Sequence, residues 1–407
     1  MIERTPDEVL APSPSREPID VEPILAAVRA RGDDALTELA AQFGDPAPRQ
    51  IESREISRAF SEAGGDLRSA LEGAAARIER FARAQRAAIA DVSIREDDLE
   101  LGHRLVAVER AGIYVPAGRH PLPSSLLMGA IPARVAGVGE RIVCTPRAGR
   151  EVLAAAHVAG IERVFELGGA QAIAAMAYGT RSVPRVDLIV GPGNAYVTAA
   201  KRALFGQCGI DALAGPSEIA IVAAADADAD LIAVDLLAQA EHDDDARALL
   251  VTDDRCFASA VGAKIESRLA TLSTAQTARA SLERRGGCIV LPLSEAPEFC
   301  NRLAPEHLSL QGSRAQALAD RFTAYGTLFI GEGAAEVFGD YGSGPNHVLP
   351  TGGTARFSSG LSVMNFLTLR TYERSLGKVN RRIANDAAIL AQAEGLIAHR
   401  QAALARR

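Results

Sequence analysis

The chain has 407 residues, enough for two or three domains, and its 48% hydrophobic and 23% charged residues are typical of a globular protein. The formal net charge is −7 with no long run of one sign, which argues against nucleic acid or an anionic membrane as a partner. No run of about 18 apolar residues occurs, so no membrane-spanning helix is expected. The five scattered cysteines form no CxxC pair, which predicts reduced thiols in a cytoplasmic protein.

The first part of the chain is predicted to be helical, because apolar residues recur at spacings near 3.6 between about residues 20 and 85. The stretch Ile56–Ala90 continues this pattern and is rich in Ala, Arg and Glu. The charged segment Asp91–Gly102 is expected to be a loop or a hairpin. Residues 1–107 are therefore expected to form an N-terminal helical region that joins the catalytic domain.

From Val108 onward, short β-rich runs alternate with Ala-rich runs of helical length, which predicts βαβ units and mostly parallel sheets. The first series has strands at Arg141–Cys144, Arg163–Leu167, Val186–Val190 and Ile219–Val222, and helices near Glu151–Ala159, Ala170–Tyr178 and Ala195–Phe205. The second series has strands at Ala248–Val251, Cys288–Leu291 and Thr327–Ile330, and helices at Leu231–Glu241, before Arg284 and before Leu303.

The expected fold class is thus α/β, with two Rossmann-like βαβ units at residues 108–217 and 218–362, an N-terminal helical layer and a C-terminal helical tail at 363–407. The stretch Gly339–Ser362 is rich in Gly, Pro and Ser and too long for a simple connector, so a functional loop is expected there. The final segment, Ile383–Arg407, is predicted to be helical and can pack on another subunit.

Two short motifs could carry a metal or proton transfer. Gln239 and His242 are three apart in LLAQAEHDDDA and share one helical face, where imidazole and amide oxygen can bind zinc. A solvated helix end would show the same pattern. Glu306 and His307 are adjacent in NRLAPEHLSL, and such a pair can divide base and acid roles worth about 10²–10⁴ in rate each. Surface pairs of this kind are also common.

Glycine-rich turns supply further candidates. The run GDYGSGPNHVLPTGG holds Asp340 and His347 in a loop stiffened by prolines, and its glycines allow close approach of the backbone to a ligand. The turns GGAQ (168–171) and GPGN (191–194) follow predicted strands and open helices, where free N–H groups favour an anion such as a pyrophosphate. Neither turn matches GxGxxG, and a tight turn without a ligand fits equally well.

Taken in order, these motifs resemble histidinol dehydrogenase from about Val108 to His399, and the N-terminal run ILAAVRARGDDAL fits the same family. The motifs are GIYVPAG, PSSLLMGAIPARVAGV, GGAQAIAAMAYGT, VDLIVGPGNAYVTAAKR, AGPSEIAIVA, LLAQAEHDDDA, NRLAPEHLSL, GDYGSGPNHVLPTGGTARFSSGLSV and EGLIAHR. The resemblance implies a four-electron oxidation of L-histidinol to L-histidine through L-histidinal, with two NAD molecules used in turn, as the final step of histidine biosynthesis.

The resemblance also implies the roles of individual residues. One zinc ion would orient the substrate, bound by Gln239, His242, Asp340 and His399. Glu306 would activate water and His307 would be the base for the alcohol proton. Ser217 and Glu394 would contact the substrate along with His307 and the zinc ligands, and Tyr114, Gln171 and Asn194 would contact NAD. The protein would be a homodimer in which the C-terminal tail enters the partner's site.

The chain departs from the family pattern at Ala117, Arg119 and His120, near the expected NAD site, and no departure removes a proposed ligand or base. Relatives in the same superfamily oxidise other small polar primary alcohols, so a paralogue with another substrate stays open. A zinc hydrolase that needs no cofactor would leave the two glycine-rich turns unexplained. A non-catalytic binding protein would not account for the acid/base pair and the metal ligands.

Overall fold

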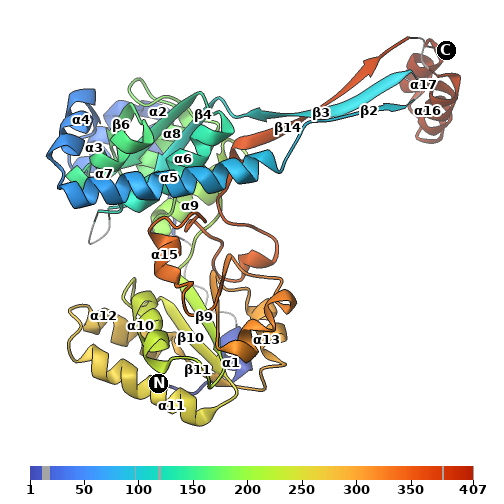
Figure 1. Ribbon diagram of the computed structural model, residues 1–407. Coiled ribbons are helices and arrows are strands. Elements are labelled where there is room, and N and C mark those ends of the chain that lie inside the picture. The colour runs from blue at the N-terminus through green and yellow to red at the C-terminus, as the bar shows by residue number, and fades with distance from the viewer. Residues whose placement is uncertain (12–18, 97, 118–120, 378–379, 407) are drawn as a thin grey trace.

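A computed structural model describes residues 1–11, 19–96, 98–117, 121–377 and 380–406. Two α/β bodies lie one above the other, and a long arm projects from the upper body (Figure 1). None of the described helices is long and apolar enough to cross a membrane. The α/β class and the mostly parallel sheets expected from the sequence are confirmed.

The upper body is built on a six-stranded sheet. Its order is β1 (Arg49–Ile51), β6 (Arg163–Glu166), β5 (Glu140–Thr145), β4 (Arg110–Tyr114), β7 (Leu188–Val190) and β8 (Gly209–Ile210). All neighbours are parallel except β1 and β6. One face packs on α4 (Ser53–Glu62), α5 (Gly65–Ala87), α6 (Pro123–Ala136) and α7 (Arg150–Ala159). The other packs on α2 (Glu22–Arg31), α3 (Asp33–Phe43), α8 (Gly169–Tyr178) and α9 (Ala195–Leu204).

The lower body has a five-stranded sheet that is parallel throughout. Its order is β11 (Gly287–Val290), β10 (Arg247–Thr252), β9 (Glu218–Ala223), β12 (His307–Gln311) and β13 (Thr327–Ile330). One face packs on α10 (Ala229–Ala240), α11 (Arg255–Leu269) and α12 (Ala275–Arg284). The other packs on α1 (Pro6–Leu10), α13 (Ala296–Leu303) and α14 (Ser313–Gln316). After β12 come the 3₁₀ turn η1 (Ala319–Arg321), the short α15 (Glu336–Asp340) and the 3₁₀ turn η2 (Thr354–Arg356). The 3₁₀ turn η3 (Val363–Phe366) packs in the core of the upper body.

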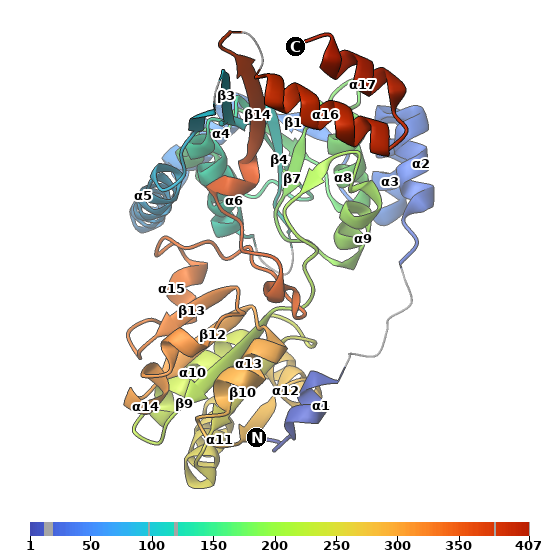
Figure 2. The same cartoon turned by 90° about the vertical axis from the view of Figure 1, so that its right-hand side faces the viewer.

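The N-terminal helices are divided between the two bodies. The backbone of Arg4 and Glu3 pairs with Cys288 at the edge of the lower sheet, so α1 lies against that body. In Figure 2, α1 stands beside the lower body whereas α2 and α3 stand beside the upper one. Helices occur where the sequence predicts them, but they do not form a single layer.

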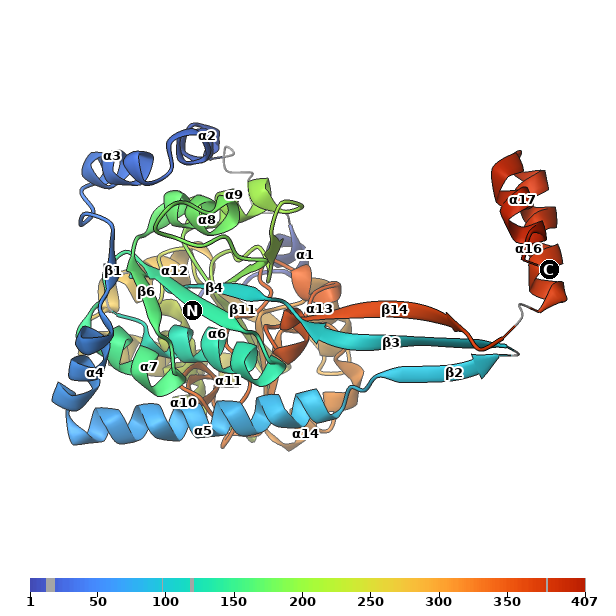
Figure 3. The same ribbon diagram turned by 90° about the horizontal axis from the view of Figure 1, so that it is seen from above.

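The arm is a three-stranded antiparallel sheet of β2 (Val92–Glu96), β3 (Leu99–Ala107) and β14 (Leu367–Ser375). Its strands run side by side away from the upper body to α16 (Arg381–Ala393) and α17 (Ile397–Leu404) (Figure 3). The charged segment 91–102 was expected to be a loop or a hairpin, and it forms part of a hairpin of β2 and β3. The third strand, β14, is not expected from the sequence.

Candidate active site

The two bodies meet at a cavity of about 280 Å³. The upper body contributes residues that follow the carboxyl ends of β4 and β7, namely Pro116, Pro192 and Gly193. The lower body contributes residues at the amino ends of its strands, among them Ser217 and His307. The cavity thus lies between the carboxyl edge of one sheet and the amino edge of the other.

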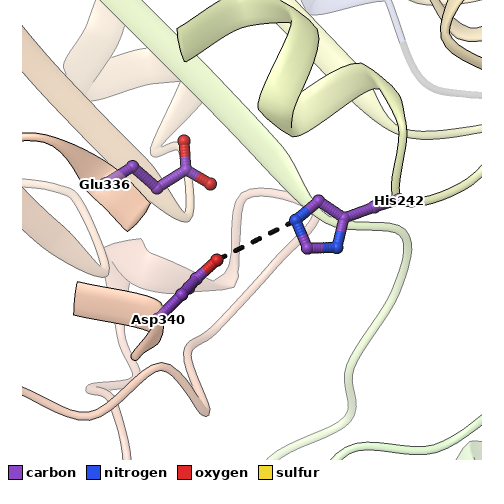
Figure 4. A group of neighbouring side chains, drawn as sticks. All are labelled: His242, Glu336 and Asp340. Atoms are coloured by element: carbon purple, nitrogen blue, oxygen red, sulfur yellow. Dashed lines mark ion pairs between the residues drawn. The ribbon is translucent and has the colours of Figure 1, made fainter. Parts of the chain in front are cut away.

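Three acidic or imidazole side chains in this region are spaced like metal ligands. One ligand atom from each of His242, Glu336 and Asp340 lies within 4.8 Å of the others (Figure 4). His242 Nε2 is 3.9 Å from Asp340 Oδ2. His242 follows α10, and Glu336 and Asp340 are the first and last residues of α15, four apart and so on one helical face. The C-terminal end of α10 and the short helix α15 therefore bring these three side chains together.

Gln239 lies in the last turn of α10 and is completely buried. Neither its amide nitrogen nor its amide oxygen has a hydrogen-bond partner within the described structure. Because an unsatisfied buried amide costs about 1–3 kcal/mol, such a group is normally explained by a water, an ion or a ligand that satisfies it. The amide and the neighbouring group of His242 and Asp340 offer nitrogen and oxygen donors that fit a zinc ion.

Glu306 and His307 lie at the amino end of β12, next to the central strand of the lower sheet. Helix α13 ends at Leu303 and is capped by Ala304, which among the described residues is the one non-glycine with a positive φ, at 49°. Pro305 then turns the chain into β12, whose first residue is His307. Both side chains are almost fully buried, with 6% and 3% exposure. The alternative of a surface pair is therefore wrong.

The carboxylate of Glu306 is held at a defined place. Its Oε2 accepts hydrogen bonds from the Ser217 hydroxyl at 2.7 Å and from the Glu218 N–H at 2.9 Å. Burial raises the pKa of Glu306 to about 8, against these hydrogen bonds, which lower it. A carboxyl group poised near neutral pH is suited to take up a proton.

His307 is surrounded by carboxylates yet stays neutral. Its Nδ1 is 3.3 Å from Glu336 Oε1 and 3.9 Å from Glu306 Oε2, and its Nε2 is 4.0 Å from Asp340 Oδ1. Burial lowers the pKa of His307 to about 4 despite the nearby Asp340, which raises it. A neutral imidazole at the cavity wall can accept a proton from a bound alcohol.

Glu336, which lies beside His242 and Asp340, and Ser125, which lines the cavity, have no role in the expectations from sequence. Glu336 is 5% exposed, and burial raises its pKa well above the usual value. Its spacing of four residues before Asp340 in EVFGD was the available signal. Ser125, in α6, lies 3.2 Å from His347 Nε2, while His347 Nδ1 lies 2.9 Å from the Asp340 carbonyl oxygen. His347 thus links α6 of the upper body to α15.

A second cavity of about 410 Å³ lies at the carboxyl edge of the upper sheet. Tyr114, Gln171 and Asn194, the residues expected to contact NAD, all line it. Tyr114 ends β4 and its hydroxyl accepts the N–H of Gly169, while Asn194 caps α9 by accepting the N–H groups of Tyr196 and Val197. Burial raises the pKa of Tyr114 to about 12, so it is a neutral hydroxyl.

This cavity occupies the place where open α/β sheets bind ligands. Strand β4 leads to β5 on one side and pairs with β7 on the other, which is a topological switch point. The two cavities also adjoin, because Pro116 lines both of them. The turn 191–194 lies between them: Pro192 and Gly193 line the first cavity, and Asn194 lines the second. Ala117 lines the second cavity, whereas Arg119 and His120 lie outside the described residues.

The structure places two of the expected site residues far from the rest. Glu394 directly follows α16 and His399 lies in α17, at the far end of the arm, and both are exposed. In a single chain they are separated from α15 by the length of the arm (Figure 1). The other expected residues, Ser217, Gln239, His242, Glu306, His307 and Asp340, come from β9, α10, β12, α15 and the segments that adjoin them.

Comparisons with known proteins agree with one another. Residues 14–407 match the family model described as histidinol dehydrogenase. The chain is 48% identical over 385 residues to histidinol dehydrogenase of Ruegeria pomeroyi, covering 92% of this chain and 89% of that protein. It is 46% identical over 393 residues to that of Nitrosomonas europaea, covering 94% and 91%. The crystal structure of histidinol dehydrogenase from Elizabethkingia anophelis matches it with a TM-score of 0.92 at 31% identity, covering 100% and 98% of the two chains.

Proposed function

The chain belongs to the histidinol dehydrogenase family, whose members are NAD-dependent oxidoreductases, and it oxidises histidinol in histidine biosynthesis; we propose that it does so with one zinc ion per site and two NAD molecules used in turn. L-Histidinol would lose a hydride and a proton to give L-histidinal. Water would then add to the aldehyde, and loss of a second hydride and a proton would give L-histidine.

The observation that carries this proposal is a buried acid/base pair beside a group of metal donors in one cavity. Gln239, His242 and Asp340 would hold the zinc, with His399 as the fourth ligand. When bound, zinc would supply a fixed point of attachment for the imidazole and amino nitrogens of the substrate. Support comes from the unpartnered amide of Gln239 and from the close spacing of His242 and Asp340.

His307 would act first, by accepting the proton of the alcohol as its carbon gives up a hydride. Support comes from its burial, which lowers its pKa and keeps the ring neutral at physiological pH. Glu306 would act second, by accepting a proton from the water that attacks the aldehyde. Support comes from the hydrogen bonds of Ser217 and the Glu218 N–H, which hold the carboxylate of Glu306 in a defined place.

NAD would occupy the second cavity, with its pyrophosphate near the N-terminal ends of α8 and α9. The positive ends of the helix dipoles favour an anion at such places, where Tyr114 and Asn194 already accept the N–H groups of Gly169, Tyr196 and Val197. Tyr114, Gln171 and Asn194 would contact the dinucleotide. Support comes from the contact between the two cavities at Pro116, where a nicotinamide ring could meet the substrate.

We also propose a cytoplasmic homodimer in which α16 and α17 complete the partner's site with Glu394 and His399. These helices expose several large apolar side chains, Ile389, Leu390, Leu396 and Ile397. Apolar surface of this kind is typical of an interface. The arm that carries them reaches away from its own body, as an exchanged element does.

Zinc content and product stoichiometry test the proposal. We expect two NADH for each L-histidinol consumed and no turnover after removal of the metal by a chelator, with activity restored by added Zn²⁺. His242→Asn should lower zinc content and activity together. His157→Asn is the matched control, because His157 stacks on Phe60 outside both cavities. Full activity in protein shown by elemental analysis to be metal-free, or one NADH per histidinol, would contradict the proposal.

A further inference from the structure

A buried ion pair lies beneath the turn that separates the two cavities. Lys201 Nζ and Asp211 Oδ1 are 2.5 Å apart, and the two side chains are 4% and 3% exposed. Lys201 lies in α9, which follows the turn, and Asp211 comes directly after β8. Neither residue lines either cavity, and neither has a role in the chemistry proposed above.

Both charges are directed at one residue, Gly191. Its N–H donates to Asp211 Oδ2 at 2.7 Å, and its carbonyl oxygen accepts from Lys201 Nζ at 2.7 Å. Gly191 has a φ of +112°, and a Cβ there would lie 2.1 Å from the carbonyl oxygen of Tyr114. The backbone is therefore pressed against the end of β4 in a conformation that only glycine adopts readily.

Asp211 also holds the start of a second segment that lines the first cavity. Its Oδ1 accepts the N–H of Ala212 at 2.7 Å, and residues 214, 215 and 217 of the segment that follows line that cavity. Thr198, in α9, donates to the carbonyl oxygen of Ala214 at 3.0 Å. One ion pair and one helix thus tie together the turn 191–194 and the segment 212–217.

We propose that Lys201 and Asp211 are positioning residues that fix the turn 191–194, so that the nicotinamide of NAD and the alcohol carbon meet at a constant distance and angle. A buried ion pair is seldom more stabilising than apolar residues of the same volume, so stability alone is a poor reason for its presence. Displacement of about 1 Å in bound groups can cost about 10² in rate. The inference rests on the proposed placement of NAD in the second cavity.

The test uses a neutral double variant, Lys201→Met with Asp211→Asn, which leaves no unpaired buried charge. We expect kcat to fall about tenfold or more and the deuterium isotope effect on kcat to rise, because hydride transfer becomes slower than the other steps. The Michaelis constant for histidinol and the zinc content should change little. Asp211→Glu keeps both charges but displaces the carboxylate, so kcat and its isotope effect should change less but in the same direction. This variant replaces the double variant in the test if the double variant does not fold.

Glu140→Gln with Arg163→Met is a control for the loss of an ion pair elsewhere in the sheet; these side chains are 32% and 34% exposed, and Glu140 also pairs with Arg110. Glu140 and Arg163 pair at 2.8 Å at the amino ends of β5 and β6, at the opposite edge of the same sheet. The control should lose thermal stability without a change in isotope effect. A double variant of Lys201 and Asp211 whose isotope effect equals that of the control, with kcat recovered at lower temperature, would overturn the inference.

A third variant separates this inference from the placement of NAD. Gln171→Leu alters the second cavity alone and should raise the Michaelis constant for NAD. If it does not, the placement of NAD is wrong, whatever the ion pair does. If it does and the ion-pair variant keeps the wild-type kcat and isotope effect, the positioning role alone is wrong.

Discussion

Burial shifts the two proton-transferring residues in opposite directions. The pKa of Glu306 rises to about 8 and that of His307 falls to about 4, because burial disfavours a negative charge on one and a positive charge on the other. Neighbours in the sequence thus approach a neutral state together near pH 7. The neutral imidazole of His307 can accept a proton directly, whereas Glu306 accepts one only in those molecules whose carboxyl group is ionised, and their fraction rises as the pH approaches 8.

The two residues should act in different steps. Glu306→Gln should slow oxidation of supplied L-histidinal by about 10²-fold or more and affect the alcohol step less, because only the aldehyde step needs activated water. His307→Asn should slow the alcohol step. Single-turnover measurements with histidinol and with histidinal separate the rates. Equal slowing of both steps by Glu306→Gln would show that its assignment to water is wrong.

Glu306 should also make the metal-free protein sensitive to alkaline pH. Its pKa in the folded state, about 8, lies above the value of about 4.3 for an unfolded chain. The protonated carboxyl is therefore favoured by folding, and this contribution is fully present below about pH 4 and lost as the pH rises through about 8. Glu306→Gln, which stays neutral, should raise the melting temperature of metal-free protein at pH 9 relative to wild type.

Asp340→Asn is a control for that measurement, since it also removes a charge from the cavity but leaves Glu306 able to ionise. Scanning calorimetry at a series of pH values, from about pH 5 to about pH 9, would give the melting temperatures of wild type and both variants. A difference between Glu306→Gln and wild type that does not grow with pH would contradict the argument.

Among individual residues, the sequence was most informative where residues proposed to act together lie close to one another in the chain. The pairs Gln239/His242 and Glu306/His307 could be named because each lies within a few residues. Glu336 was missed although it stands four residues before Asp340, because this spacing becomes notable only when the burial of Glu336 is known. The same holds for Lys201 and Asp211, whose common target, Gly191, is defined by the folded backbone.

Strands that read as short apolar, β-rich runs between helical stretches were predictable even though they are buried, whereas elements without such a pattern were not. The strands β5, β6, β9 and β10 lie within a residue or two of their predicted bounds. Helix α6 has no polar face, since ten of its residues are buried, so it lacks helical periodicity. Strand β12 reads HLSLQ, whose polar residues belong to an exposed face in most strands but here are buried.

The turn at Gly191 offers a test at the scale of an element. Gly191→Ala should destabilise the protein and raise the Michaelis constant for NAD, because the new methyl group would lie 2.1 Å from the carbonyl oxygen of Tyr114. Gly206→Ala is the matched control: Gly206 has a similar φ of +99° but nothing within 4 Å of its Cβ position. Both variants carry backbone strain on the order of 1 kcal/mol.

Urea denaturation and steady-state kinetics on the two alanine variants separate strain from contact. The control should lose stability only, with NAD kinetics unchanged. Equal effects of the two substitutions on stability and on the Michaelis constant would mean that the close approach at Tyr114 has no bearing on the cofactor.

At the scale of the whole molecule, the main uncertainty left by the sequence was the direction of the C-terminal tail. A terminal helix can fold back on its own body or cross to a neighbour, and both leave the same pattern in sequence. Strand β14 pairs with β3 over nine residues and carries α16 and α17 outward. This pairing depends on contacts between residues that are distant in sequence, which periodicity does not reveal.

Mixing of inactive variants tests whether the site is shared. His242→Ala and His399→Ala should each be inactive, and subunit exchange between them should restore activity. A heterodimer with crossed tails has one site with both defects and one with neither, so a random mixture should reach about a quarter of wild-type activity. Activity of the exchanged mixture is the measurement.

The control mixes His242→Ala with Gln239→Ala, whose defects lie in the same body. Every site in that mixture keeps a defect, so it should stay inactive. Heterodimers of the first pair that are verified by mass and remain inactive would rule out the crossed tail.

The arm also bears on how the chain is made. Strands β2 and β3 leave the ribosome early, but β14, which covers the open edge of β3, follows only after the whole lower body has been synthesised. The core of the upper body likewise waits for Val363 and Phe366, which are completely buried in it. A nascent chain therefore carries an uncovered strand edge for most of its synthesis, which is a surface that molecular chaperones bind and that pairs readily between chains.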